Sequence, residues 1–248
     1  MTTFGVVFVL ALLAVPAVAG AQEPRQPLPA PDLRGQLTPR RFTTLAAEVP
    51  AKVDKVAVRE GERFKEGQLL VGLDCSVQRA QLDRARAVLA SAEKVHAAQK
   101  RLVELKSSGA LEAEAAAMKA AEARGDVAVL NATVSKCSIT APFPGRVVEQ
   151  KIRDQQFVQP GNPMLDILDD GAFELEFIMP SRALAGLKVG QPFQILVEEM
   201  GRPYPARIAR IGAKVDAVSQ SIKVVGEIDG KFPELIAGMS GKILLTPP

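Results

Sequence analysis

Apolar residues recur at helical spacing through the middle of the chain, between its two cysteines. Spacings of three, four and seven residues predict a helix over residues 76–106 and a second over 110–134, with a Ser-Ser-Gly turn at 107–109. The two helices would form an antiparallel hairpin with a narrow, alanine-rich seam. The recurring positions are Leu82, Ala85, Leu89 and Ala92, and again Val88, Val95 and Leu102; those expected to face them from the second helix are Leu111, Ala115, Met118, Ala121, Gly125 and Ala132.

Two short β-type motifs flank the predicted hairpin and resemble each other. The first covers residues 61–74 and the second covers 155–169. When Gly67 is aligned with Gly161, the Leu-Asp pair that ends the first motif falls on the Leu-Asp pair that ends the second, after one inserted residue, Pro163. This repeat predicts one small β-module into which the hairpin is inserted.

After residue 170 the pattern becomes that of β-strands. Phe173, Leu175 and Phe177 alternate with glutamates, which is a period of two, and residues 180–187 resemble a short helical turn. Several short strands separated by glycine turns predict a small barrel. The further strand-like runs are Phe193–Glu198, Tyr204–Ile211, Ile222–Ile228 and Lys242–Leu245.

The first 41 residues follow neither pattern. An uncharged apolar run over residues 4–18, followed by small residues, predicts a signal peptide over 1–21 that is cleaved after Ala19 or Ala21. Because no basic residue precedes the run, an uncleaved anchor remains an alternative. Five prolines then fill residues 22–41, which predicts an extended, disordered tether. Export would place the chain in a compartment that permits disulfides.

The spacing of the two cysteines predicts a disulfide. Facing residues in an antiparallel hairpin have a constant sum of positions, and the midpoint of Cys75 and Cys137 lies within three residues of the predicted turn. The two side chains should therefore meet at the base of the hairpin. The alternative is a pair of free, buried thiols.

Composition removes several classes of function. The 248 residues carry a net charge of +3, with no Trp and one Tyr, which offers neither a basic patch nor a stacking platform for nucleic acid. One His and two Cys are too few for a structural zinc site of the usual kind. The sequence shows no Ser/His/Asp arrangement, phosphate-binding glycine loop or Gly-x-Ser-x-Gly motif, so we expect neither an enzyme nor a cofactor.

Four motifs together resemble a known family. They are Leu-Leu-x-x-Leu-Asp at 69–74, Thr-Ala-Pro-Phe-x-Gly at 140–145, and the barrel motifs at 211–220 and 235–241. Over residues 42–246 the chain resembles the periplasmic adaptor subunits of tripartite efflux pumps, the membrane fusion proteins of the HlyD-like and RND types. The resemblance implies a non-catalytic protein that links an inner-membrane transporter to an outer-membrane channel of the TolC type.

The same resemblance implies an α+β, mainly β fold. Residues 42–75 and 137–170 would be the two halves of a lipoyl-like barrel-sandwich hybrid. A helical coiled-coil hairpin over 76–136 would interrupt them, and a small β-barrel domain would follow over 171–248. Many RND-type relatives continue into a membrane-proximal domain that contacts the transporter. With the sequence ending at Pro248, that contact is expected to be either reduced or made by the barrel.

The resemblance also implies partners and contact residues. It favours an RND-type over an ABC transporter, and self-association into a hexameric ring. Relatives that dock to TolC-type channels carry an Arg, a Leu four residues on and a Ser seven further on. Arg101 and Leu105 match, whereas Glu112 replaces the Ser and is expected to pair with Arg101 or Lys106, or to alter channel preference. The alternative is that these are ordinary solvated residues at a helix end.

Two other functions share some of these features. Lipoyl and biotinyl carriers have the same repeat, but they need a modified Lys on the turn between the halves, and here residues 76–136 replace that turn. A periplasmic metal-delivery or solute-binding protein could use methionine sulfur as a soft ligand. The four candidate methionines are scattered and His96 stands alone, which is more typical of core positions. These methionines are Met164, Met179, Met200 and Met239.

Overall fold

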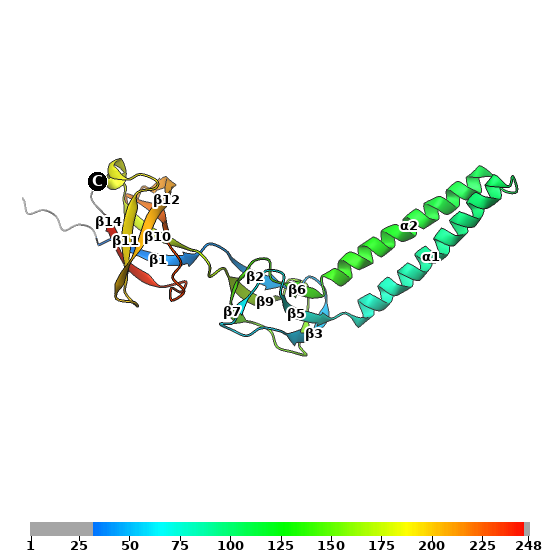
Figure 1. Ribbon diagram of the computed structural model, residues 1–248, viewed down its shortest axis with the longest axis horizontal. Helices are drawn as coiled ribbons and strands as arrows, with labels where there is room; N and C mark the ends of the chain where they lie inside the picture. The colour runs from blue at the N-terminus through cyan, green and yellow to red at the C-terminus, as the bar shows by residue number, and fades with distance from the viewer. Residues whose placement is uncertain (1–31, 246–248) are drawn as a thin grey trace, which may run out of the picture. The chain divides into compact units, whose positions relative to one another are not determined.

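The computed structural model, shown in Figure 1, describes residues 32–245. The expected signal peptide and most of the tether lie outside the described residues. Within them, strands form a closed barrel and two smaller sheets, and the helices α1 (Ser76–Glu104) and α2 (Ala110–Ser135) pack as a pair. None of the described helices is both long enough and apolar enough to cross a membrane. The expectation of a mainly β chain with a β-barrel is confirmed.

Six antiparallel strands close the barrel in the order β1-β10-β13-β12-β11-β14. Phe173, Leu175 and Phe177 all point into its core, as their alternation predicts, and a 3-10 helix over Ser181–Gly186 follows them. The ring of Phe177 packs edge-on against that of Phe193 with 5.5 Å between centroids. The strands are β1 (Arg34–Pro39), β10 (Phe173–Pro180), β11 (Pro192–Val197), β12 (Arg202–Asp216), β13 (Ser221–Ile228) and β14 (Ser240–Leu245).

The barrel corrects one boundary drawn from the sequence. Residues 34–39 form the strand β1, paired with β10 and β14, and are not part of a disordered tether. Only Gly35 and Leu37 of β1 are buried, so its hydrophobic signal is too short to stand out beside the prolines. The strand forms because the barrel would otherwise leave the edges of β10 and β14 unpaired.

Two four-stranded sheets enclose a second core, and they show the repeat directly. The sheet orders are β2-β9-β7-β4 and β6-β5-β3-β8. Each sheet contains two strands from each half: the first combines β2 and β4 with β7 and β9, and the second combines β3 and β5 with β6 and β8. Each half therefore completes the other. The strands are β2 (Phe42–Ala46), β3 (Ala51–Val56), β4 (Arg63–Phe64), β5 (Leu69–Asp74), β6 (Ser138–Thr140), β7 (Gly145–Gln150), β8 (Phe157–Val158) and β9 (Pro163–Leu168).

The Thr-Ala-Pro-Phe-x-Gly motif lies where the chain returns from α2 into these sheets. Phe143 is buried, and the Arg41 guanidinium lies over its ring, 4.6 Å from the centroid. Arg41 also pairs with the buried carboxylate of Asp169 at 2.6 Å. Gly145 passes so close to β9 that a Cβ there would lie 1.9 Å from the carbonyl oxygen of Leu168. The motif thus fixes a close backbone approach rather than a chemical site.

We expect Gly145→Ala to lower the free energy of unfolding by about 1–3 kcal/mol, because the obstructing atom is backbone and cannot rotate away. The matched control is Gly125→Ala in α2, where an added Cβ meets no described atom within 4 Å. That change should stabilise the helix by about 1 kcal/mol. Urea unfolding of both variants measures the difference, and equal stabilities would contradict the close approach.

Asp166 of β9 is a buried carboxylate with two partners. It accepts a hydrogen bond from Thr44 Oγ1 at 2.6 Å and pairs with Lys151 Nζ at 2.6 Å. The hydrogen bond from Lys151, followed by that from Thr44, holds the pKa of Asp166 below its usual value. A lowered pKa stabilises the fold above the unfolded-state pKa of about 3.9, and this stabilisation is lost as the pH falls through the folded-state pKa.

Asp166→Asn is therefore expected to make the unfolding free energy less dependent on pH below about 4. Urea midpoints measured across the acid range would show it. Asp54→Asn, which removes an exposed carboxylate from β3, serves as the control for the loss of one surface charge. Parallel acid-unfolding curves for the parent and Asp166→Asn would contradict the assignment.

Candidate partner-binding site on the helix pair

The two helices pack along a seam with heptad spacing. Residues that lose solvent exposure recur three and four positions apart on both helices, and Leu82, Ala120 and Ala123 are fully buried. Alanine fills much of the α2 side, which lets the helix axes approach closely. The heptad positions are Gln78, Leu82, Ala85, Leu89, Ala92, His96, Gln99 and Val103 on α1, and Ala113, Ala116, Ala120, Ala123, Val127, Leu130 and Val134 on α2.

The seam confirms the predicted face of α1 only in part. The first of the two predicted stripes on α1, Leu82 to Ala92, lies in the seam, whereas Val88 and Val95 of the second are each 51% exposed. The predicted face of α2 is wrong, since its members Leu111 and Met118 are 76% and 67% exposed. Apolar or small residues occupy every side of α2, so more than one heptad register fits its sequence, and packing against α1 selects among them.

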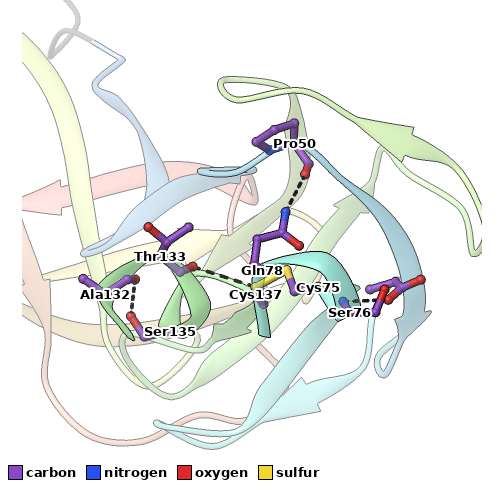
Figure 2. The surroundings of a disulfide bond; sticks show 9 residues. Pro50, Cys75, Ser76, Gln78, Ala132, Thr133, Ser135 and Cys137 are labelled. Atoms are coloured by element: carbon purple, nitrogen blue, oxygen red, sulfur yellow. Dashed lines mark hydrogen bonds between the residues drawn. A yellow bond between two sulfur atoms is a disulfide. The ribbon is translucent and has the colours of Figure 1, made fainter. Parts of the chain in front are cut away.

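The disulfide predicted from spacing joins the two helices at their base. Cys75 directly precedes α1 and Cys137 follows α2, with a Cα–Cα distance of 6.1 Å (Figure 2). Both residues are buried in the core of the two sheets. Gln78 Nε2 donates to the carbonyl of Pro50 at 3.3 Å (Figure 2), and Lys136 pairs with Glu48 at 2.6 Å. The disulfide thus joins the two helix bases to each other, and the polar contacts tie them to the segment between β2 and β3.

The other end of the pair is a short, well-defined turn. Lys106 adopts a left-handed backbone conformation with φ 58°. The N–H of Ser107 donates to the carbonyl of Leu102 at 2.8 Å, and the N–H of Lys106 donates to Val103 at 2.9 Å. These two bonds are those of a Schellman cap, which satisfies the last carbonyls of α1. The turn therefore holds the two helix ends in a fixed relation.

The structure exposes the tip residues singled out from the sequence. Leu105 is 61% exposed, and the Arg101 side chain, whose described partner is Glu104 at 3.4 Å, is 73% exposed. Glu112 behaves differently from expectation. It has no ion pair with Arg101 or Lys106 within residues 32–245; its carboxylate folds over Gly109, where an added Cβ would lie 2.4 Å from Oε2. Glu112 lies in the first turn of α2, where its negative charge interacts favourably with the helix dipole.

The candidate metal-ligating side chains of the described residues do not gather in one place. No group of three or more His, Cys, Asp or Glu side chains that could hold a metal ion lies within residues 32–245. Met164 is buried in the core of the two sheets and Met179 in that of the barrel, so these sulfur atoms do not converge. His96 is half-buried in the helix seam. The exposed tip is therefore the candidate site that the structure retains.

Comparison with known proteins agrees with this architecture, although no family model matches the chain. The multidrug resistance protein MdtA of Pectobacterium carotovorum is 27% identical over 220 residues, which cover 79% of this chain and 53% of MdtA. The membrane fusion protein Spr0693 of Streptococcus pneumoniae R6 superposes with a TM-score of 0.72 at 17% identity, over 87% of this chain and 98% of that one.

A second solved structure resembles the chain equally well. A MacA–MexA chimera containing the Pseudomonas aeruginosa MexA α-hairpin domain gives a TM-score of 0.75 at 20% identity, over 85% of this chain and 78% of the chimera. The chain spans 53–62% of the length of the first three curated relatives it matches. These findings confirm the resemblance to the membrane fusion proteins, the non-catalytic periplasmic adaptors of tripartite efflux pumps.

Proposed function

We propose that this chain is the periplasmic adaptor that links an inner-membrane transporter to an outer-membrane channel of the TolC type. The observation that carries the proposal is the helix pair, whose base a disulfide closes within the core of the two sheets and which presents an exposed Arg and Leu at its other end. A long helix pair with an exposed tip is suited to contacting a partner protein at a distance from the sheets.

The two sheets are a lipoyl-like barrel-sandwich hybrid interrupted by a coiled-coil hairpin. The building of each sheet from two strands of each half supports the first assignment, and the heptad seam supports the second. A lipoyl or biotinyl carrier would have its modified lysine on the turn between the two halves. In this chain the helix pair leaves the sheets at that point, so the architecture favours an adaptor over a carrier.

The tip contacts the channel through Arg101 and Leu105. The contact between Arg101 and Glu104 is a long pair between exposed groups, which contributes little stability and is easily exchanged. The guanidinium can then bind carboxylates or carbonyls on a partner helix, and Leu105 can enter an apolar groove. Because Glu112 folds over Gly109, it acts on channel preference by shaping the turn and its charge.

We favour an RND-type transporter over an ABC transporter as the inner-membrane partner. A hexameric ring of adaptors would enclose the path between the two membranes, since one narrow helix pair cannot form a wall. Two relatives, multidrug resistance protein MdtA and pyoverdine export membrane fusion protein PvdR, have names that support an export role.

Affinity purification of the tagged chain from its own host tests the proposal. After mild cross-linking, an inner-membrane transporter and an outer-membrane channel should both be enriched, and deletion of the gene should lower export. Purification of neither membrane protein, together with unchanged export in the deletion strain, would refute the adaptor role. Tight copper or zinc binding in a titration of the purified chain would instead favour metal delivery.

A further inference from the structure

A hollow of about 570 Å³ lies at the end of the β-barrel where β10 begins and β13 ends. Its apolar wall contains Phe173, Ile228, Phe232 and Leu235. Small-molecule sites have volumes of about 300–1,000 Å³ and are lined mainly by apolar and aromatic side chains with a few polar groups. The hollow therefore has the size and the apolar wall of a ligand site, and the helix pair takes no part in it.

The loop between β13 and β14 forms one wall and is held in place by several contacts. The ring of Phe232 packs edge-on against that of Tyr204, with 5.0 Å between centroids. The N–H of Leu235 donates to the carbonyl of Phe232 at 3.1 Å, and the N–H of Gly238 donates to the carbonyl of Leu37 at 2.8 Å. Because these contacts fix the loop, the hollow is preformed and a ligand has little of the chain to order when it binds.

Positive charge predominates around the hollow. Its walls contain four basic and two acidic side chains, a surplus of two positive charges. These side chains are Arg40, Arg63, Arg207 and Lys231, and Asp170 and Glu227. A ligand that enters the hollow therefore meets an environment that favours an anion.

The ion pairs at the hollow orient its cations without using all their donors. Arg40 and Arg207 both donate to the carboxylate of Glu227, the second at 3.3 Å, and Arg207 also pairs with Asp229 at 2.7 Å. Each guanidinium has five N–H donors, so these pairs leave donors for a ligand. The exposed Lys231 forms no ion pair with any residue in 32–245. We call Arg40, Arg207 and Lys231 the cationic rim.

We propose that this hollow binds an amphipathic organic anion, with its carboxylate or sulfonate at the cationic rim and its apolar body against Phe173 and Phe232. Such a head group accepts charge-assisted hydrogen bonds from the rim, and the apolar body covers side chains that water would otherwise contact. A cationic amphiphile of the same shape would be repelled by the surplus positive charge. The inference rests on the proposed adaptor function for the origin of the ligand, which would be the compound that the pump exports.

Fluorescence titration of the purified chain with anilinonaphthalene sulfonate, followed by competition with decanoate, tests the site. The probe should bind, and decanoate should displace it. Inorganic phosphate, which has no apolar body, and decyltrimethylammonium, which has the opposite charge, should not displace it at the same concentration. Equal displacement by decanoate and decyltrimethylammonium would contradict a cationic rim that selects the ligand.

Two variants test the rim and the hollow separately. Lys231→Glu reverses an exposed charge and should weaken the decanoate-sensitive binding about tenfold. Ala172→Phe, at a half-buried position in the wall, should fill the hollow and abolish that binding. The matched control is Lys214→Glu, which reverses an exposed charge elsewhere on β12 and should bind like the parent. Parent-like binding by Lys231→Glu, or an equal loss in the control, would overturn the site whether or not Ala172→Phe folds.

Export distinguishes this inference from the adaptor role. Cells with Lys231→Glu should export an anionic amphiphile less well than parent cells. If deletion of the gene lowers export but the rim variant binds decanoate like the parent, the site is wrong and the adaptor role stands. If the variant loses binding but deletion leaves export unchanged, the adaptor role fails and the ligand is not an exported compound. Displacement of the probe by phosphatidylglycerol vesicles but not by decanoate would identify a membrane lipid and contradict a freely dissolved ligand.

Discussion

Cells that carry Arg101→Asp or Leu105→Ala in this protein are expected to export no better than a strain without the gene. The aspartate reverses the charge of an exposed group that has one weak partner, so it would repel the carboxylates that the guanidinium attracts. The alanine removes the exposed apolar side chain at the end of α1. Retention of a fluorescent substrate in intact cells measures the loss.

Two matched variants control for general damage to the helices. Arg86 forms the same kind of i,i+3 pair as Arg101, with Asp83, and Val77 near the base is 64% exposed, much like Leu105. Arg86→Asp and Val77→Ala should export normally. All four variants should keep the parent's thermal midpoint, because they change surface positions. Normal export by both tip variants would show that the tip does not contact the channel.

Removal of the disulfide by Cys75→Ala and Cys137→Ala is expected to lower the free energy of unfolding by about 4 kcal/mol. The bond closes a loop with a sequence separation of 62, and cross-linking a loop of that length removes much of the conformational freedom of the unfolded chain. Urea unfolding followed by circular dichroism measures the change. Reduction of the parent protein should cause a similar loss and should not affect the double variant.

Thiol labelling of the purified parent protein tests directly whether the disulfide forms. Thiol labelling after denaturation without reductant should detect no free cysteine, whereas two labelled thiols per chain would show that the bond does not form. A double variant with an unfolding free energy within about 0.5 kcal/mol of the parent would show that the helix base is held by its polar contacts instead.

Much of this architecture could be predicted because local pattern and tertiary packing agree. The alternation around Leu175 and the heptads around Leu82 both predict faces that the structure buries. The position of the disulfide followed from hairpin geometry alone, since two facing residues must lie equally far from the turn. The first Leu-Asp pair ends the strand β5. In the second pair, Leu168 is the last residue of β9 and Asp169 follows it. The strands β5 and β9 occupy equivalent places in the two sheets.

The features that escaped prediction depend on neighbours distant in sequence. The strand β1 has two buried residues and forms because β10 and β14 need a partner. The face of α2 that packs against α1 could not be predicted, because alanines are spread over every side of the helix. The packing against α1 selects that face. The position of Glu112 depends on the absence of a Cβ at Gly109, which only the folded turn reveals.

The most direct test of the adaptor account is a photo-reactive amino acid placed at Leu105 in living cells, followed by identification of the cross-linked protein. Leu105 is exposed, so a reactive side chain placed there can reach a bound partner. The account predicts a product with an outer-membrane channel, lost when Arg101→Asp is also present. A product with the inner-membrane transporter alone, or none while export is active, would contradict the proposal that this helix tip reaches the channel.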